Sequence, residues 1–125
     1  MNFDHLIPAT DTPQKCGRVA VLMGGTSAER AVSLKSGSFV FQALHNAGVD
    51  AFAVDLNQNI LSQLQSLQAD RVFNILHGRG GEDGEVQAIL EILNLPYTGS
   101  GGKASAVTMD KLMTKRLLLG SGINT

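Results

Sequence analysis

The segment Arg18–Met23 constrains the fold of this chain more than any other part of its sequence. It is a short apolar run rich in valine, and the glycine pair Gly24-Gly25 ends it. A run of this length, closed by glycines, is typical of a strand that is buried on both faces of a parallel sheet.

Later segments extend this pattern. Residues 51–55 and 71–76 are similar apolar runs, and Pro96-Tyr-Thr98 predicts a short fourth strand. Apolar residues at helical spacing predict amphipathic helices between and after these runs, the first of them stopping at Gly48. The residues expected on the apolar helix faces are Val32, Phe39, Val40, Ala43, Leu44 and Ala47; Ile60, Leu61, Leu64 and Leu67; Val86, Ile89, Leu90 and Leu93; and Leu112, Met113, Leu117 and Leu118.

Strands that alternate with helices at this spacing form right-handed βαβ units. The predicted fold is therefore α/β, with a small open parallel sheet flanked by helices on both faces. We expect one domain over residues 18–122, a flexible tail over residues 1–17 and the start of a linker at residues 123–125.

The composition is that of a soluble globular domain. Of the 125 residues, 43% are hydrophobic and 17% are charged, and the formal net charge is -1. No basic excess favours nucleic acid, and Lys111, Lys115 and Arg116 fit one solvated helix face. No apolar run approaches the ~20 residues of a membrane-spanning helix. The N-terminus does not resemble a signal peptide, and the single Cys16 permits no intramolecular disulfide, so we expect a cytoplasmic protein.

Ligands of open parallel sheets bind at the carboxyl ends of the strands, where this chain has glycine-rich loops. The first loop, Gly24-Gly-Thr-Ser-Ala-Glu-Arg30, leaves two interpretations of Glu29 open. Thr26 and Glu29 fit a capping box, in which both side chains bind backbone N–H groups at a helix start. In the other interpretation, the Glu29 carboxylate holds the ammonium group of a substrate.

The second loop begins at His77 and continues as Gly78-Arg-Gly-Gly-Glu-Asp-Gly84. A lone histidine at a strand end fits a structural role, but the glycines after it leave little side-chain cover and favour contact with solvent or ligand. Arg79, Glu82 and Asp83 fit solvated loop charges. The three histidines of the chain lack the spacing of metal ligands, so we expect no metal site here.

Other familiar sites are excluded by their spacing. The third loop, Gly99-Ser-Gly-Gly-Lys103, lacks the first glycine and the final serine or threonine of a phosphate-binding loop. The first loop lacks the glycine pattern of a dinucleotide site. A nucleophile elbow, a cysteine–histidine pair and a helical H-E-x-x-H motif are absent from the sequence, so it offers no self-contained hydrolytic apparatus.

Four segments together resemble the D-alanine–D-alanine ligases in order and spacing. They are Val19–Arg30 followed by Val32-Ser33-Leu34, then Leu76–Gly84, Pro96–Gly101 and Met109-Asp110-Lys111, and they cover about residues 18–124. These ligases are ATP-grasp enzymes. The resemblance therefore implies the Rossmann-like domain that precedes the ATP-grasp domain.

The resemblance also implies a reaction and site residues. The family uses ATP and Mg²⁺ to activate one D-alanine as an acyl phosphate, and the amine of a second D-alanine displaces phosphate to give the dipeptide for peptidoglycan. Glu29, helped by the backbone near Val32, would position the ammonium group of the first D-alanine. His77 would lie near its carboxylate, Ser33 would shape the pocket wall and Lys111 would face the nucleotide. Relatives are usually homodimers, so a homodimer is a further expectation.

The sequence departs from the family in two places. Ala31 stands where many relatives have a second glutamate, and Gly102-Lys103 replaces two larger, mostly apolar residues. We expect the second change to loosen the turn before the next helix.

The ATP-grasp portion of the family is absent from these 125 residues, so we expect the isolated chain to be inactive. A stand-alone small-molecule-binding module and a nonfunctional, marginally folded truncation product remain as alternatives.

Overall fold

The computed structural model describes residues 13–125. A short 3-10 helix, η1 (Pro13–Cys16), precedes strand β1 (Val19–Gly24), helix α1 (Arg30–Asn46), strand β2 (Ala51–Leu56), helix α2 (Ile60–Gln65) and strand β3 (Arg71–Asn74). Three helices follow: α3 (Glu85–Ile92), α4 (Gly102–Met109) and α5 (Lys111–Gly120). The flexible tail was expected over residues 1–17. Residues 1–12 of it lie outside the described part of the chain, and η1 occupies residues 13–16.

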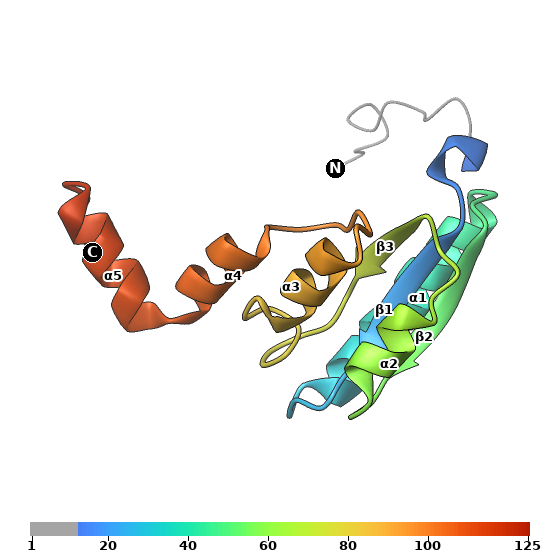
Figure 1. Cartoon of the computed structure of the whole chain (residues 1–125), viewed down its shortest axis with the longest axis horizontal. Coiled ribbons are helices and arrows are strands. Elements are labelled where there is room, and N and C mark those ends of the chain that lie inside the picture. Colours follow the sequence, from blue (N-terminus) through green and yellow to red (C-terminus); the bar gives the residue numbers. More distant parts are fainter. Residues whose placement is uncertain (1–12) are drawn as a thin grey trace, which may run out of the picture.

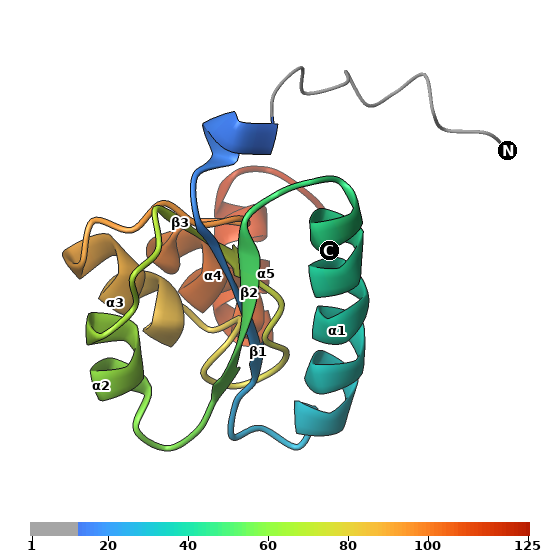
Figure 2. The same cartoon turned by 90° about the vertical axis from the view of Figure 1, so that its right-hand side faces the viewer.

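The sheet is open and parallel, with the strand order β2-β1-β3. All six residues of β1 are buried, as its apolar sequence predicts, because this strand lies between the other two. Helix α1 covers one face of the sheet, and α2 and α3 lie on the other (Figure 2). The predicted α/β class, with helices on both faces, is confirmed.

The fourth strand is smaller than predicted. Tyr97 forms only an isolated parallel bridge with Val72, in which Val72 N–H donates to the Pro96 carbonyl and Thr98 N–H donates to the Val72 carbonyl. The segment thus pairs with β3 over one position, because the chain turns away at Gly99, where φ is +106°. The regular sheet has three strands.

The helix predictions were right for α3 and partly wrong for α1. Val86 and Leu90 of α3 are buried in the core against β1 and β3, as expected. In α1, however, Val32 and Phe39 are exposed by 57% and 66%, and the fully buried positions are Ser33 and Gly37. A Cβ on Gly37 would lie 2.6 Å from Met23 Cβ. Small residues therefore face the sheet because α1 approaches β1 too closely for large ones.

Helices α4 and α5 lead away from the sheet, and α5 lies at the far end of the molecule from β1 (Figure 1). Asp110 separates them, because its carboxylate accepts hydrogen bonds from the N–H groups of Leu112 and Met113 and so caps α5. Helix α5 packs against α4 and contains no buried residue. No described helix is both long and apolar enough to cross a membrane.

Candidate functional site

The candidate site lies where β1 and β3 end, because the chain continues there into the two glycine-rich loops singled out in the sequence. Ser27, in the first loop, joins them: its hydroxyl donates to the His77 carbonyl at 2.7 Å and accepts from Glu29 N–H at 3.1 Å. The backbone positions of Glu29 and His77 are therefore fixed relative to one another. The sequence interpretation overlooked Ser27, which stands between the residues it emphasised.

The capping-box interpretation of Glu29 was wrong. Glu29 is the N-cap residue of α1, but its side chain makes no capping hydrogen bond. The Glu29 N–H is bound by Ser27 instead of by Thr26. With no backbone group to satisfy, the Glu29 carboxylate is available for another partner.

The Glu29 carboxylate lies against Gly78, directly beside His77 in the chain. A Cβ on Gly78 would stand 2.8 Å from Glu29 Oε1, and Gly78 has a φ of +67° that side-chain-bearing residues rarely adopt. Glycine at this position thus lets the second loop approach the carboxylate closely. The structure brings Glu29 and the His77 loop together, although 47 residues separate Glu29 from His77 in the chain.

His77 has more side-chain cover than its glycine neighbours suggest. Its Nε2 lies 3.2 Å from Ser36 Oγ, its Nδ1 lies 4.0 Å from Glu82 Oε1, and its side chain is 28% exposed. The imidazole is therefore held between α1 and the second loop, with part of the ring open to solvent.

The acidic residues of the second loop hold the loop in shape and are not merely solvated charges. Glu82 Oε2 accepts from Gly78 N–H at 2.7 Å, and Asp83 Oδ2 accepts from Gly80 N–H at 2.8 Å. In addition, the side-chain amides of Asn74 and Gln87 both donate hydrogen bonds to the Gly81 carbonyl. These bonds make the loop a defined wall.

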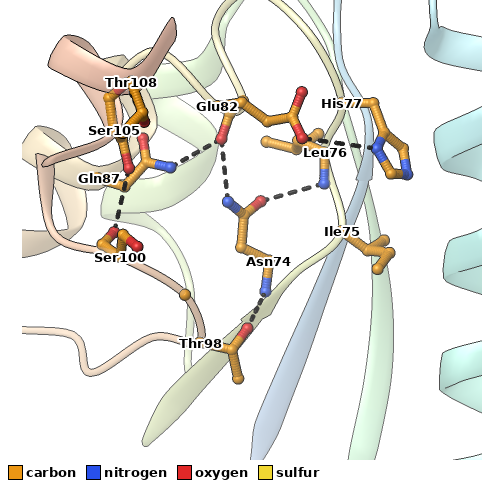
Figure 3. A pocket seen from close by; sticks show the side chains of 12 residues that line it. Asn74, Ile75, Leu76, His77, Glu82, Gln87, Thr98, Ser100, Ser105 and Thr108 are labelled. Carbon is orange, nitrogen blue, oxygen red and sulfur yellow. Dashed lines mark hydrogen bonds and ion pairs between the residues drawn. The ribbon is translucent and has the colours of Figure 1, made fainter. Parts of the chain in front are cut away.

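A cavity of about 360 Å³ opens behind this wall (Figure 3). Asn74, Glu82 and His77 stand on its β3 side, and Ser105 and Thr108 of α4 close the opposite side. The lining is rich in hydroxyl and amide groups. Such a lining suits a small polar molecule or ordered water.

Ser33 and Val32 occupy different places in the first turns of α1. Ser33 is fully buried; its hydroxyl accepts from Gly24 N–H at 2.9 Å and donates to the Ile75 carbonyl at 2.8 Å. It thereby joins the ends of β1 and β3 beneath the site. Val32 is exposed, and its carbonyl accepts from Ser36 Oγ. The substrate contacts expected of both residues stay predictions.

An ion pair beside the first loop was missed in the sequence. Arg30 donates to both carboxylate oxygens of Asp55 at 2.7 Å and also to the carbonyls of Gly25 and Leu56. The hydrogen bonds from Arg30, with its charge, lower the pKa of Asp55. Arg30 thus fixes the first loop to the end of β2. The position of Arg30 beside Glu29 in the sequence gave no sign that its partner lies on β2.

Glu91 accepts two hydrogen bonds at the turn before α4, where the Gly102-Lys103 departure lies. Glu91 Oε1 accepts from Gly102 N–H at 2.9 Å and from the Tyr97 hydroxyl at 2.6 Å. The first of these bonds, followed by the second, lowers the pKa of Glu91. A carboxylate on α3 thus joins the start of α4 to Tyr97, and the expected loosening of this turn stays a prediction.

The structure does not bring Lys111 to the other candidate residues. Lys111 begins α5 and is exposed, and α5 lies at the far end of the molecule from β1 (Figure 1). Within residues 13–125, no three His, Cys, Asp or Glu side chains gather into a group that could hold a metal ion.

Comparison with known sequences identifies close relatives. Residues 57–100 match the family model described as D-ala D-ala ligase N-terminus. D-alanine–D-alanine ligases from Pseudomonas putida and Pseudomonas fluorescens are 61% and 58% identical to this chain over 98% and 94% of its length. The chain spans only 38% and 36% of those two relatives.

Solved structures agree with the sequence comparison. The D-alanine–D-alanine ligase of Bacillus anthracis complexed with ATP superimposes with a TM-score of 0.79 at 36% identity, over 87% of this chain and 38% of that one. The Aeromonas hydrophila ligase gives a TM-score of 0.72 at 33% identity, over 86% of this chain and 48% of that one. The chain therefore belongs to the D-alanine–D-alanine ligase family and corresponds to its N-terminal domain.

Proposed function

We propose that this domain supplies part of the pocket for the first D-alanine of a D-alanine–D-alanine ligase. The observation that supports it best is the placement of Glu29. The Glu29 carboxylate makes no capping hydrogen bond and lies against Gly78, the residue after His77. Ser27 forms hydrogen bonds with the backbone of both Glu29 and His77. An acceptor and an imidazole thus stand at the same sheet edge.

This pair suits a zwitterionic amino acid. The Glu29 carboxylate would accept hydrogen bonds from the substrate ammonium group, and His77 would lie on the side of the substrate carboxylate. Charge-assisted bonds of this kind contribute roughly 1.5–3 kcal/mol each. The first turn of α1 presents backbone N–H groups, which favour an anion, so Val32 would serve the substrate carboxylate better than its ammonium group.

ATP and Mg²⁺ would be used by the complete enzyme, and the described residues do not fit them alone. Phosphoryl transfer depends on positioned cations around the phosphates and on metal-binding acids. Residues 13–125 contain no cluster of metal-binding side chains, and Lys111 begins α5, which lies at the far end of the molecule from β1 (Figure 1). We therefore propose that this chain is inactive by itself. A cytoplasmic location and a homodimer remain parts of the proposal.

A second candidate function is a binding module without catalysis. The cavity of about 360 Å³ beside His77 favours it, because a site of that size could hold a small molecule without help from another domain.

A chimera separates the two. The chain is fused to the remaining portion of the Pseudomonas putida ligase, and phosphate release is measured with ATP, Mg²⁺ and D-alanine. We expect D-alanine-dependent release from the chimera and none above background from the isolated chain. Release from the isolated chain would refute its proposed inactivity. A folded chimera that binds D-alanine without releasing phosphate would favour the binding module.

A further inference from the structure

Ser36 contacts the His77 ring, and the proposed function assigns no role to this serine. It lies in the second turn of α1, is partly buried, and places its Oγ 3.2 Å from His77 Nε2. The same Oγ lies 2.8 Å from the Val32 carbonyl and 3.3 Å from the Ser33 carbonyl.

The hydroxyl hydrogen of Ser36 has one best destination. A serine hydroxyl carries a single hydrogen and two lone pairs, whereas a carbonyl can only accept. At 2.8 Å the Val32 carbonyl takes that hydrogen, as serines in helices commonly donate to the carbonyl four residues earlier. Toward His77, Ser36 Oγ is left able only to accept. The hydrogen in the 3.2 Å contact must then be on Nε2.

We propose that Ser36 is a positioning residue that holds the neutral His77 imidazole in its Nε2–H tautomer. Nδ1 is then the ring nitrogen with the free lone pair, and it faces the second loop. If the proposed function is right, on which this last step rests, a substrate carboxylate can bind His77 through Nδ1 only when that nitrogen also carries a proton.

Glu82 favours the opposite tautomer, with the hydrogen on Nδ1. Ser36 and Glu82 therefore predict different protonation states of the His77 ring. Glu82 Oε1 lies 4.0 Å from Nδ1, where a carboxylate attracts a hydrogen on that nitrogen. That separation is too long for a hydrogen bond, whereas the 3.2 Å contact with Ser36 is within range. Removing the Ser36 hydroxyl should therefore shift the proton toward Nδ1.

The test is the ¹⁵N spectrum of the histidine rings in the labelled 125-residue chain, which distinguishes protonated from unprotonated ring nitrogens. It is recorded at about pH 9, well above the ordinary histidine pKa. A His77→Asn variant identifies the His77 signals among those of the three histidines. We expect the wild-type protein to show Nε2 protonated and Nδ1 bare.

Three serine variants complete the test. Ser36→Ala should lower the ratio of the Nε2–H to the Nδ1–H tautomer roughly two- to tenfold, the factor that one ordinary hydrogen bond supplies. Ser36→Thr keeps a hydroxyl and should restore most of the wild-type ratio. Ser38→Ala is the matched control, because Ser38 Oγ donates to the Lys35 carbonyl on the same helix, and it should leave the ratio unchanged.

Two results would overturn the inference. One is a wild-type ring protonated mainly on Nδ1, and the other is a tautomer ratio that Ser36→Ala leaves unchanged in a folded chain. The spectrum is recorded without D-alanine or ATP. A failure of the proposed ligase function would therefore leave this result standing, and the reverse also holds.

Discussion

The Ser27 hydroxyl donates a 2.7 Å hydrogen bond to the carbonyl of His77, which lies 50 positions further along the chain. The same oxygen accepts from Glu29 N–H. One small side chain thereby fixes the spacing between the two loops that form the candidate site. Removing the Ser27 side chain should therefore affect both the stability of the fold and the geometry of the site.

Ser27→Ala should lower the free energy of unfolding by about 1–2 kcal/mol, because one partly buried and one exposed hydrogen bond are lost and the partly buried His77 carbonyl loses its donor. Urea denaturation followed by circular dichroism measures this. Ser38→Ala, which removes a hydroxyl from the exposed side of α1, should change stability by less than about 0.5 kcal/mol. Equal effects of the two variants would show that the Ser27 bridge contributes nothing.

The Tyr97 hydroxyl should ionise at a higher pH than an ordinary tyrosine. Burial, followed by the hydrogen bond to Glu91, raises the pKa of Tyr97 to about 12. The unfolded chain releases this proton near the ordinary tyrosine pKa of about 10, so stability should be lost as the pH rises from about 10 to 12. Tyr97 is the sole tyrosine, and the absorbance of its phenolate reports on it alone. Glu91→Gln should shift the titration to lower pH, and a wild-type midpoint near 10 in the folded chain would contradict the account.

The Arg30–Asp55 pair should make the fold sensitive to acid. Because Arg30 lowers the pKa of Asp55, its contribution is complete above the ordinary aspartate pKa of about 3.9 and is lost as the pH falls through the lower, folded-state value. Asp55→Asn should reduce the urea midpoint at neutral pH and weaken its decline below about pH 4. Asp50→Asn, at another exposed aspartate, is the control and should retain the wild-type profile. An unchanged profile in Asp55→Asn would mean that the pair does not stabilise the fold.

Gly102 and Gly84 should respond in opposite ways to alanine. A Cβ on Gly102 would meet its nearest neighbours at 3.5 Å or more, so Gly102→Ala should stabilise the chain by about 0.4–1 kcal/mol. Gly84 has a φ of +94°, and a Cβ there would lie 2.6 Å from the Gly102 carbonyl oxygen. Gly84→Ala should therefore destabilise the chain by more than about 1 kcal/mol. Thermal denaturation of both variants checks the contrast, and destabilisation by Gly102→Ala would show that the turn cannot accept a side chain.

The strands were predictable where local composition decides burial. The apolar run at β1 must be covered on both faces, so its central place in the sheet follows from its residues. Helix α1 was harder, because its contact with the sheet depends on how closely two elements approach. Gly37 and Ser33 face β1, while the large Phe39 points outward, and periodicity of hydrophobic residues cannot reveal such a face.

The candidate site was predictable in its residues but not in its connections. Glycine-rich loops after β1 and β3 indicated where Glu29 and His77 would meet. The roles of Ser27 and Ser36 depend on partners 50 and 41 positions away, and those pairings arise only when the parallel strands bring their ends together. The only local indication that Ser27 has a role was its position inside a glycine-rich loop.

The most direct test of the central claim is the effect of Glu29 on D-alanine turnover in the chimera with the Pseudomonas putida portion. Glu29→Gln keeps the size of the side chain but removes the charge that would hold the substrate ammonium group. It should lower kcat/KM for D-alanine by roughly 10- to 100-fold, and Glu85→Gln, at an exposed glutamate that begins α3, should lower it by less than about twofold. A Glu29→Gln chimera with the turnover of the unaltered chimera would contradict the assignment of this sheet edge as the first D-alanine site.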